Sequence, residues 1–155
     1  MGHSYLFGLG SPFGGDQLGW RSADLLQHHF ADRADITVAR LSQPTDLFLY
    51  PVTPADLTIF MDAMLSEQAS GHVRQFTARH IPDRPQVISS HGISLRTTVD
   101  LLLGMGFASE QIRIFAFDIA DTSTAADLDA AARLMAARIC ETLGRPADAD
   151  PLAGG

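Results

Sequence analysis

The sequence predicts an α/β fold, a three-layer sandwich in which a mostly parallel, twisted sheet of about five strands carries helices on both faces. Two observations lead to this prediction. Short apolar runs alternate along the chain with longer segments whose apolar residues recur at helical spacing. The clearest short run, residues 57–61, is apolar almost throughout, as is typical of a strand buried on both faces of a parallel sheet.

The first half of the chain supplies three strands and one helix. Residues 5–7 form an apolar strand that runs into the turn Gly8-Leu9-Gly10. A helix follows over residues 18–30, and its inward face is expected to carry Leu18, Leu25, Leu26 and His29. Residues 36–41 form the second strand. Residues 57–61 form the central strand, which the sequence predicts to end at Asp62.

The second half supplies two strands and two helices. Residues 73–77 are diluted by charged and polar side chains, which favours a strand at the edge of the sheet. A helix begins at Ser94, and its apolar stripe is formed by Leu95, Val99, Leu102 and Leu103. Strand 112–119 precedes a last helix over residues 125–143, whose stripe is formed by Leu128, Ala132, Met135, Ile139 and Leu143.

Length and composition bound the class of protein. With 155 residues, 46% of them hydrophobic, the chain is expected to form one domain over residues 1–145, followed by a flexible tail over 146–155. A net charge of −7 argues against nucleic acid, and the absence of lysine excludes a Schiff base and a P-loop. One cysteine allows no internal disulfide, and no apolar run is long enough to span a membrane. We expect a cytoplasmic protein and a monomer.

Three polar residues are placed where a parallel sheet gathers its ligands, at the carboxyl ends of strands. Asp16 lies in the turn after the first strand, Asp62 follows the central strand, and His91 precedes the helix that begins at Ser94. Two carboxylates and an imidazole suit a divalent metal and leave coordination positions open. Each residue also has a structural interpretation, because such Asp residues often cap helices or form turns and a lone His often lies at the surface. Only their joint placement favours a metal site.

The glycine loop over residues 8–15 allows a second interpretation. Its first half is similar to the dinucleotide pattern G-x-G-x-x-G, but Phe13 occupies the sixth position and Pro12 stiffens the turn. A phosphate cradle of backbone N–H groups and a tight strand-to-helix connection both stay open. There is no Gly-x-Ser-x-Gly nucleophile elbow, and Cys140 falls inside the last helix, where we expect a packed hydrophobe.

In their order along the chain, these motifs resemble the [NiFe]-hydrogenase maturation endopeptidases, which trim the hydrogenase large subunit. That family has a strand running into G-x-G-N, an acidic residue three before a glycine, an apolar strand ending in Asp-Ala, and a Ser-Pro-His-like segment before a leucine-rich helix. The counterparts here are Gly8-Leu9-Gly10-Ser11, Asp16-Gln17-Leu18-Gly19, Phe60-Met61-Asp62-Ala63 and Ser89-Ser90-His91. The match runs from about Tyr5 to Leu143.

The resemblance implies an endopeptidase that removes the C-terminal extension of a [NiFe]-hydrogenase large-subunit precursor after nickel insertion. Asp16, Asp62 and His91 match the family residues that engage the nickel, so they are the catalytic and metal-binding candidates. The nickel is expected to arrive with the substrate, and other divalent metals can occupy such a site. Ser11 stands in place of the family's asparagine and Gly15 in place of an acidic residue, which leaves the substrate open. The alternative is a catalytically silent assembly factor, or a phosphate- or nucleotide-binding module that uses the glycine loop.

Overall fold

The computed structural model describes residues 2–65, 71–81, 95–120 and 123–144. The strands are β1 (Ser4–Leu9), β2 (Ile36–Leu41), β3 (Leu57–Leu65), β4 (Val73–Thr77) and β5 (Ile112–Ile119). The helices are α1 (Leu18–His29), α2 (Leu95–Gly104) and α3 (Ala125–Thr142), with short 3-10 helices η1 (Gly14–Gln17), η2 (Pro44–Leu49) and η3 (Ser109–Gln111). The predicted tail lies outside the described residues, so the division of the chain at residue 145 stays a prediction.

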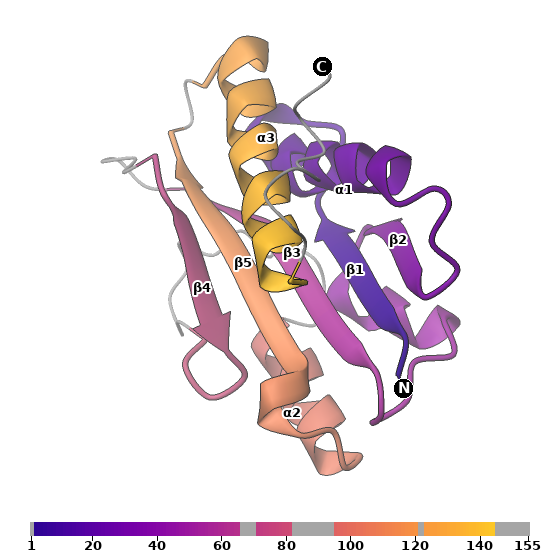
Figure 1. Ribbon diagram of the computed structural model, residues 1–155. Coiled ribbons are helices and arrows are strands. Elements are labelled where there is room, and N and C mark those ends of the chain that lie inside the picture. Colours follow the sequence, from indigo (N-terminus) through magenta and orange to yellow (C-terminus); the bar gives the residue numbers. More distant parts are fainter. Residues whose placement is uncertain (1, 66–70, 82–94, 121–122, 145–155) are drawn as a thin grey trace.

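The five strands form one sheet in the order β2-β1-β3-β5-β4 (Figure 1). Neighbouring strands run parallel except at one edge, where β4 is antiparallel to β5. The chain passes from β1 to β2 on one side and then crosses to β3 on the other side of β1. Strand order therefore reverses between β1 and β3, and in α/β sheets this is the place where ligands bind.

Each face of the sheet carries its own apolar core, which confirms the predicted three-layer sandwich. Alternate residues of a strand point to opposite faces, so β3 contributes Ile59 and Met61 to one core and Phe60 to the other. Helices α1 and α3 cover the first face, where Figure 1 shows them side by side. Helix α2 and η2 cover the second face. Among the described residues, no helix is long and apolar enough to cross a membrane.

Two sequence predictions need correction. The central strand does not end at Asp62, because β5 pairs with β3 as far as Leu65. Asp62 therefore lies inside a strand. The inward face of α1 was predicted incompletely: Leu18 and Leu26 are buried and Leu25 packs partly buried against the core, as expected, but His29 is only partly buried. The buried face also includes three small residues that were not predicted, namely Gly19, Ser22 and Ala23. Cys140 is buried in α3, as predicted.

Candidate functional site

Asp62 is a fully buried carboxyl group at the strand-order reversal. It is in phase with Phe60, so its side chain belongs to the face of the sheet that α2 covers in part. On one side β5 continues past it, but on the other side β1 ends at Leu9, and the β1–β3 ladder stops at the Gly8–Met61 pair. The neighbouring strand thus ends at the level of Asp62. This opens the sheet beside Asp62, although the strand that carries Asp62 continues past it.

The Asp62 carboxyl group is only half satisfied by the described part of the chain. Its Oδ1 accepts a hydrogen bond from the Ala63 backbone N–H at 2.8 Å. Its Oδ2 is buried and has no hydrogen-bond partner among the described residues. Buried polar atoms in native proteins nearly always find a partner, so an oxygen left over in this way marks a place where a ligand can bind.

The environment of Asp62 opposes its negative charge. Burial raises the pKa of this carboxyl well above its usual range, the hydrogen bond from the Ala63 N–H lowers it in part, and the negative charge of Asp16 raises it further. The repulsion from Asp16 is informative about position, because it requires the two carboxylates to lie within electrostatic reach of each other. Two of the three residues predicted from the sequence, Asp16 and Asp62, therefore interact electrostatically, and their role in a metal site stays a prediction.

Asp16 reaches this place through the loop that follows β1. The loop closes on itself: the Ser11 N–H donates to the Asp16 carbonyl at 3.1 Å, and the Asp16 N–H donates to the Phe13 carbonyl at 3.2 Å. Gly14 has a φ of +52°, a conformation that residues with a side chain rarely adopt. Asp16 itself lies in η1, directly before α1.

Gly19 lets the start of α1 approach the sheet closely enough to hold Asp16 beside β3. A Cβ atom at this position would lie 2.0 Å from the Leu9 carbonyl oxygen and 2.8 Å from the Met61 carbonyl oxygen. Both distances are impossible for real atoms, so only glycine fits between β1 and β3. The spacing of an acidic residue three before a glycine thus has a physical reason: the glycine seats the helix, and the acidic residue lies one turn ahead of it.

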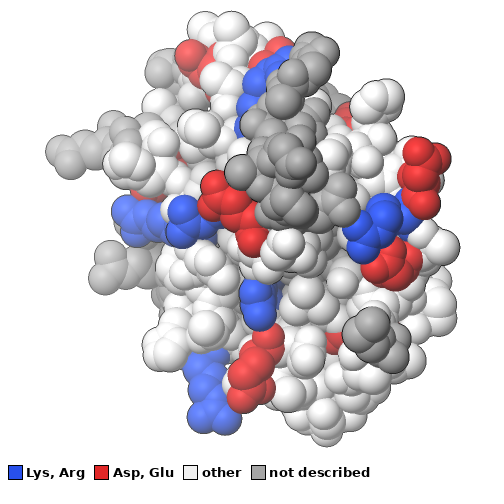
Figure 2. All heavy atoms as spheres, viewed as in Figure 1, with Lys and Arg blue, Asp and Glu red and all other residues white. Residues whose placement is uncertain are grey.

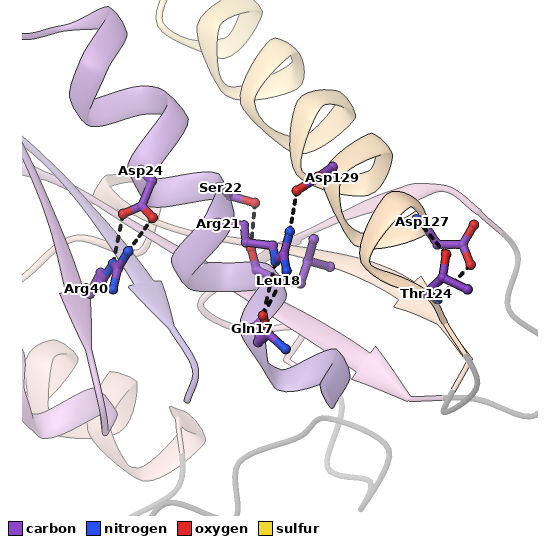
Figure 3. Close-up of polar contacts among 9 residues, drawn as sticks. All are labelled: Gln17, Leu18, Arg21, Ser22, Asp24, Arg40, Thr124, Asp127 and Asp129. Atoms are coloured by element: carbon purple, nitrogen blue, oxygen red, sulfur yellow. Dashed lines mark hydrogen bonds and ion pairs between the residues drawn. The ribbon is translucent and has the colours of Figure 1, made fainter. Parts of the chain in front are cut away.

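A polar bridge ties the Asp16 segment to α3. Arg21 donates from Nε and Nη2 to the Gln17 Oε1, at 3.2 and 3.0 Å, and also pairs with Asp129 of α3 (Figure 3). Gln17 directly follows Asp16. These side chains line a groove of about 470 Å³ on the α1 and α3 face of the sheet, opposite to the face that carries Asp62. On this face acidic and basic side chains are interspersed, without a continuous basic surface among the described residues (Figure 2).

The third predicted ligand, His91, lies outside the described residues, so its convergence with the two carboxylates stays a prediction. Within the described ranges, no group of three or more His, Cys, Asp and Glu side chains is placed to hold a metal ion. The donors that are present, two carboxylates, suit a hard or borderline divalent cation, and an imidazole would complete the set predicted from the sequence.

Sequence reasoning missed one charged pair on the same face of the sheet. Asp118 of β5 is buried and forms an ion pair with Arg74 of β4, with Nη2 and Oδ2 3.0 Å apart. The signal was available, because Asp118 interrupts the apolar end of strand 112–119. A charge inside such a run needs a partner or a function.

The glycine loop is a weak candidate for a phosphate cradle. The backbone N–H groups of Gly10, Ser11, Phe13 and Asp16 all donate within the protein, to Leu41 O, Asp16 O, Ser11 Oγ and Phe13 O respectively. An anion site needs such groups to converge on a common point instead. The loop therefore fits a tight strand-to-helix connection better than a nucleotide site.

Comparison with known proteins finds no matching family model and no matching curated protein sequence. Solved structures do match. The [NiFe] hydrogenase maturation protease HycI from Thermococcus kodakarensis KOD1 is 17% identical with a TM-score of 0.71, over 92% of this chain and 93% of that one. The hydrogenase maturating endopeptidase HybD from E. coli is 14% identical with a TM-score of 0.65, over 92% of both chains. An endopeptidase from Escherichia coli is 13% identical with a TM-score of 0.71, over 91% of both. The chain therefore has the fold of the [NiFe]-hydrogenase maturation proteases, the family that its sequence motifs resemble.

Proposed function

We propose that this protein is an endopeptidase that removes the C-terminal extension of a [NiFe]-hydrogenase large-subunit precursor after nickel insertion. Asp16, Asp62 and His91 recognise the nickel that the precursor carries. The observation on which the proposal rests is the half-satisfied, buried carboxyl group of Asp62, coupled to Asp16 at the strand-order reversal. The shared fold supports the assignment, because several proteins of this fold are hydrogenase maturation proteases.

The chemistry of the site supports recognition of a metal that the substrate brings. Asp62 offers a buried oxygen that has no partner within the described part of the chain, and Asp16 adds a second carboxyl group. With His91 the set has one imidazole and no thiolate, whereas protein zinc sites rely more heavily on Cys and His. Such a set holds a free ion weakly, but it can complete the coordination of an ion already held by the precursor. Cleavage then depends on a finished nickel centre.

The deciding experiment compares two forms of the large-subunit precursor from the same organism, one loaded with nickel and one in which the nickel-binding residues are replaced. We expect cleavage of the loaded form alone, read as loss of the C-terminal extension by mass spectrometry. Elemental analysis of the purified enzyme should find little stoichiometric metal. Adding nickel to the enzyme should not restore cleavage of the form that cannot bind nickel.

Matched variants connect this result to the site. Asp62→Asn and His91→Ala should stay folded and lose cleavage, whereas Asp32→Asn, which removes one exposed carboxylate elsewhere, should keep it. Tightly retained metal together with cleavage of the nickel-free precursor would point to an ordinary metalloprotease. Binding of the loaded precursor without cleavage would identify an assembly factor instead.

A further inference from the structure

Arg74 lies on an edge strand, in the same row of the sheet as Asp62. Asp62 is paired with Ala116 of β5, and Ala116 is paired on its other side with Arg74 of β4. The two Cα atoms are thus two strand spacings apart, roughly 10 Å. Arg74 is in phase with Phe76, which packs in the core on the Asp62 face, so both side chains belong to that face. A small residue, Ala116, separates them.

Asp118 holds the Arg74 guanidinium at the end of this row. Its carboxylate lies two residues beyond Ala116, toward the carboxyl end of β5, and its side chain is 3% exposed. The Arg74 side chain that pairs with it is 52% exposed. The guanidinium is therefore anchored to a buried carboxylate, while about half of the Arg74 side chain stays exposed to solvent. Anchoring fixes a long side chain whose freedom would otherwise oppose binding.

The charges around the site indicate which kind of group Arg74 binds. The protein has a net charge of −7, and the site contains the negative charge of Asp16 beside the carboxyl group of Asp62. A peptide carrying its own carboxylate would be repelled there unless a cation received it. Guanidinium groups match carboxylates in shape and bind them by charge-assisted hydrogen bonds. Arg74 is placed to supply that cation, because its Cα lies roughly 10 Å from that of Asp62, a distance that an extended peptide spans in about three residues.

We propose that Arg74, positioned by Asp118, is a substrate-binding residue that receives an acidic side chain of the precursor close to the scissile bond. The inference rests on the proposed function and deepens it, because it names a charge that the substrate must carry beside the metal. It also assigns two separate roles: Asp16 and Asp62 engage the metal, and Arg74 engages the peptide.

The test measures KM and kcat for cleavage of the nickel-loaded precursor by Arg74→Gln, with Arg113→Gln as the matched control. Arg113 is also on the sheet, but it is paired with Ile59 and Thr77 and points to the other face. We expect Arg74→Gln to raise KM about tenfold with little change in kcat, because a hydrogen bond to a charged group is lost in binding. Arg74→Lys should recover part of the loss, and Arg113→Gln should behave like the unmodified protein.

Precursor variants make the test independent of enzyme folding. Each Asp or Glu within a few residues of the scissile bond is changed to Asn or Gln, and cleavage by the unmodified enzyme is measured. One of these changes should raise KM about as much as Arg74→Gln does, and combining the two should add nothing further. Two outcomes would overturn the inference while leaving the proposed function standing. In one, the KM increases caused by Arg74→Gln and by the precursor substitution are fully additive; in the other, no substitution of an acidic residue in the precursor changes KM. An unmodified enzyme that cleaves no nickel-loaded precursor would overturn both.

Discussion

Replacing Asp62 by Asn should stabilise the metal-free protein at neutral pH and remove its activity. The Asn side chain keeps the size of Asp and keeps an oxygen that can accept the hydrogen bond from the Ala63 N–H. What it loses is the negative charge, which is disfavoured because the group is buried and lies near Asp16. Active sites commonly sacrifice stability in this way.

The size of the effect follows from the direction of the pKa shift. The Asp62 pKa is raised in the folded protein above its unfolded value of about 3.9. At pH values between the unfolded and the folded pKa of Asp62, the folded state binds more protons than the unfolded state. The free energy of unfolding therefore falls as pH rises in this interval, by up to about 1.4 kcal/mol per pH unit. Below the unfolded pKa both states are protonated and the charge term vanishes. Asp62→Asn does not lose stability in this way. Its free energy of unfolding should therefore exceed that of the unmodified protein by an amount that grows with pH until the folded pKa of Asp62 is passed.

Urea denaturation at pH values from about 4 to 8, in the presence of a chelator, measures this difference. Asp32→Asn serves as control, because it also removes one negative charge from a chain of net charge −7 but acts on an exposed residue. A stability difference between Asp62→Asn and the unmodified protein that is the same at both ends of the pH range would contradict a raised pKa of Asp62. An equal gain in the Asp32→Asn control would contradict it as well.

Two further predictions concern the elements that hold the site. Gly19→Ala should destabilise the fold by about 1–3 kcal/mol and displace Asp16 from Asp62, because the added Cβ would collide with backbone oxygens of β1 and β3. In the control Gly104→Ala the added Cβ meets nothing within 4 Å, so this variant should be neutral or stabilising. Thermal unfolding of both variants measures the difference. Thr124→Ala should lower the free energy of unfolding by about 0.5–2 kcal/mol, measured by urea denaturation, because it removes a helix cap at the start of α3. In this cap the Thr124 hydroxyl accepts a hydrogen bond from the Asp127 N–H, and the Asp127 carboxylate accepts one from the Thr124 N–H. An unchanged urea midpoint would argue against the cap.

The strands could be predicted because each is a short, apolar and well-separated run. Four of the five end within a residue or two of their predicted bounds, and even the weak run at Val73–Thr77 was correctly assigned to an edge. The extension of β3 past Asp62 could not be predicted in this way. A carboxylate normally ends an apolar strand, and nothing local to residues 57–65 shows that β5 will pair with it as far as Leu65.

The candidate site was predictable only in part, for a related reason. Asp16 and Asp62 follow from the rule that ligands gather where parallel strands end, and the β1 side of the sheet does end at the level of Asp62. The burial of Asp62, its Oδ2 atom without a partner among the described residues, and the Arg74–Asp118 pair all depend on which strands become neighbours. Strand order is a property of the whole chain. No spacing between Arg74 and Asp118 in the sequence reveals that β4 and β5 are paired.

The raised pKa of Asp62 also bears on how such a site can be selective. A carboxyl group that resists ionisation must lose a proton before it binds a cation, so a free metal ion competes with that proton and binds weakly. An ion that arrives already held by precursor thiolates meets the same proton, but the docking of the whole precursor contributes binding energy that a free ion lacks. Contacts outside the metal, of the kind proposed for Arg74, add to that energy. If Asp62 binds the metal, its protonation weakens both binding events by the same factor. A free ion has no other contacts to offset that cost and would stay unbound, whereas a loaded precursor would still bind through its contacts outside the metal.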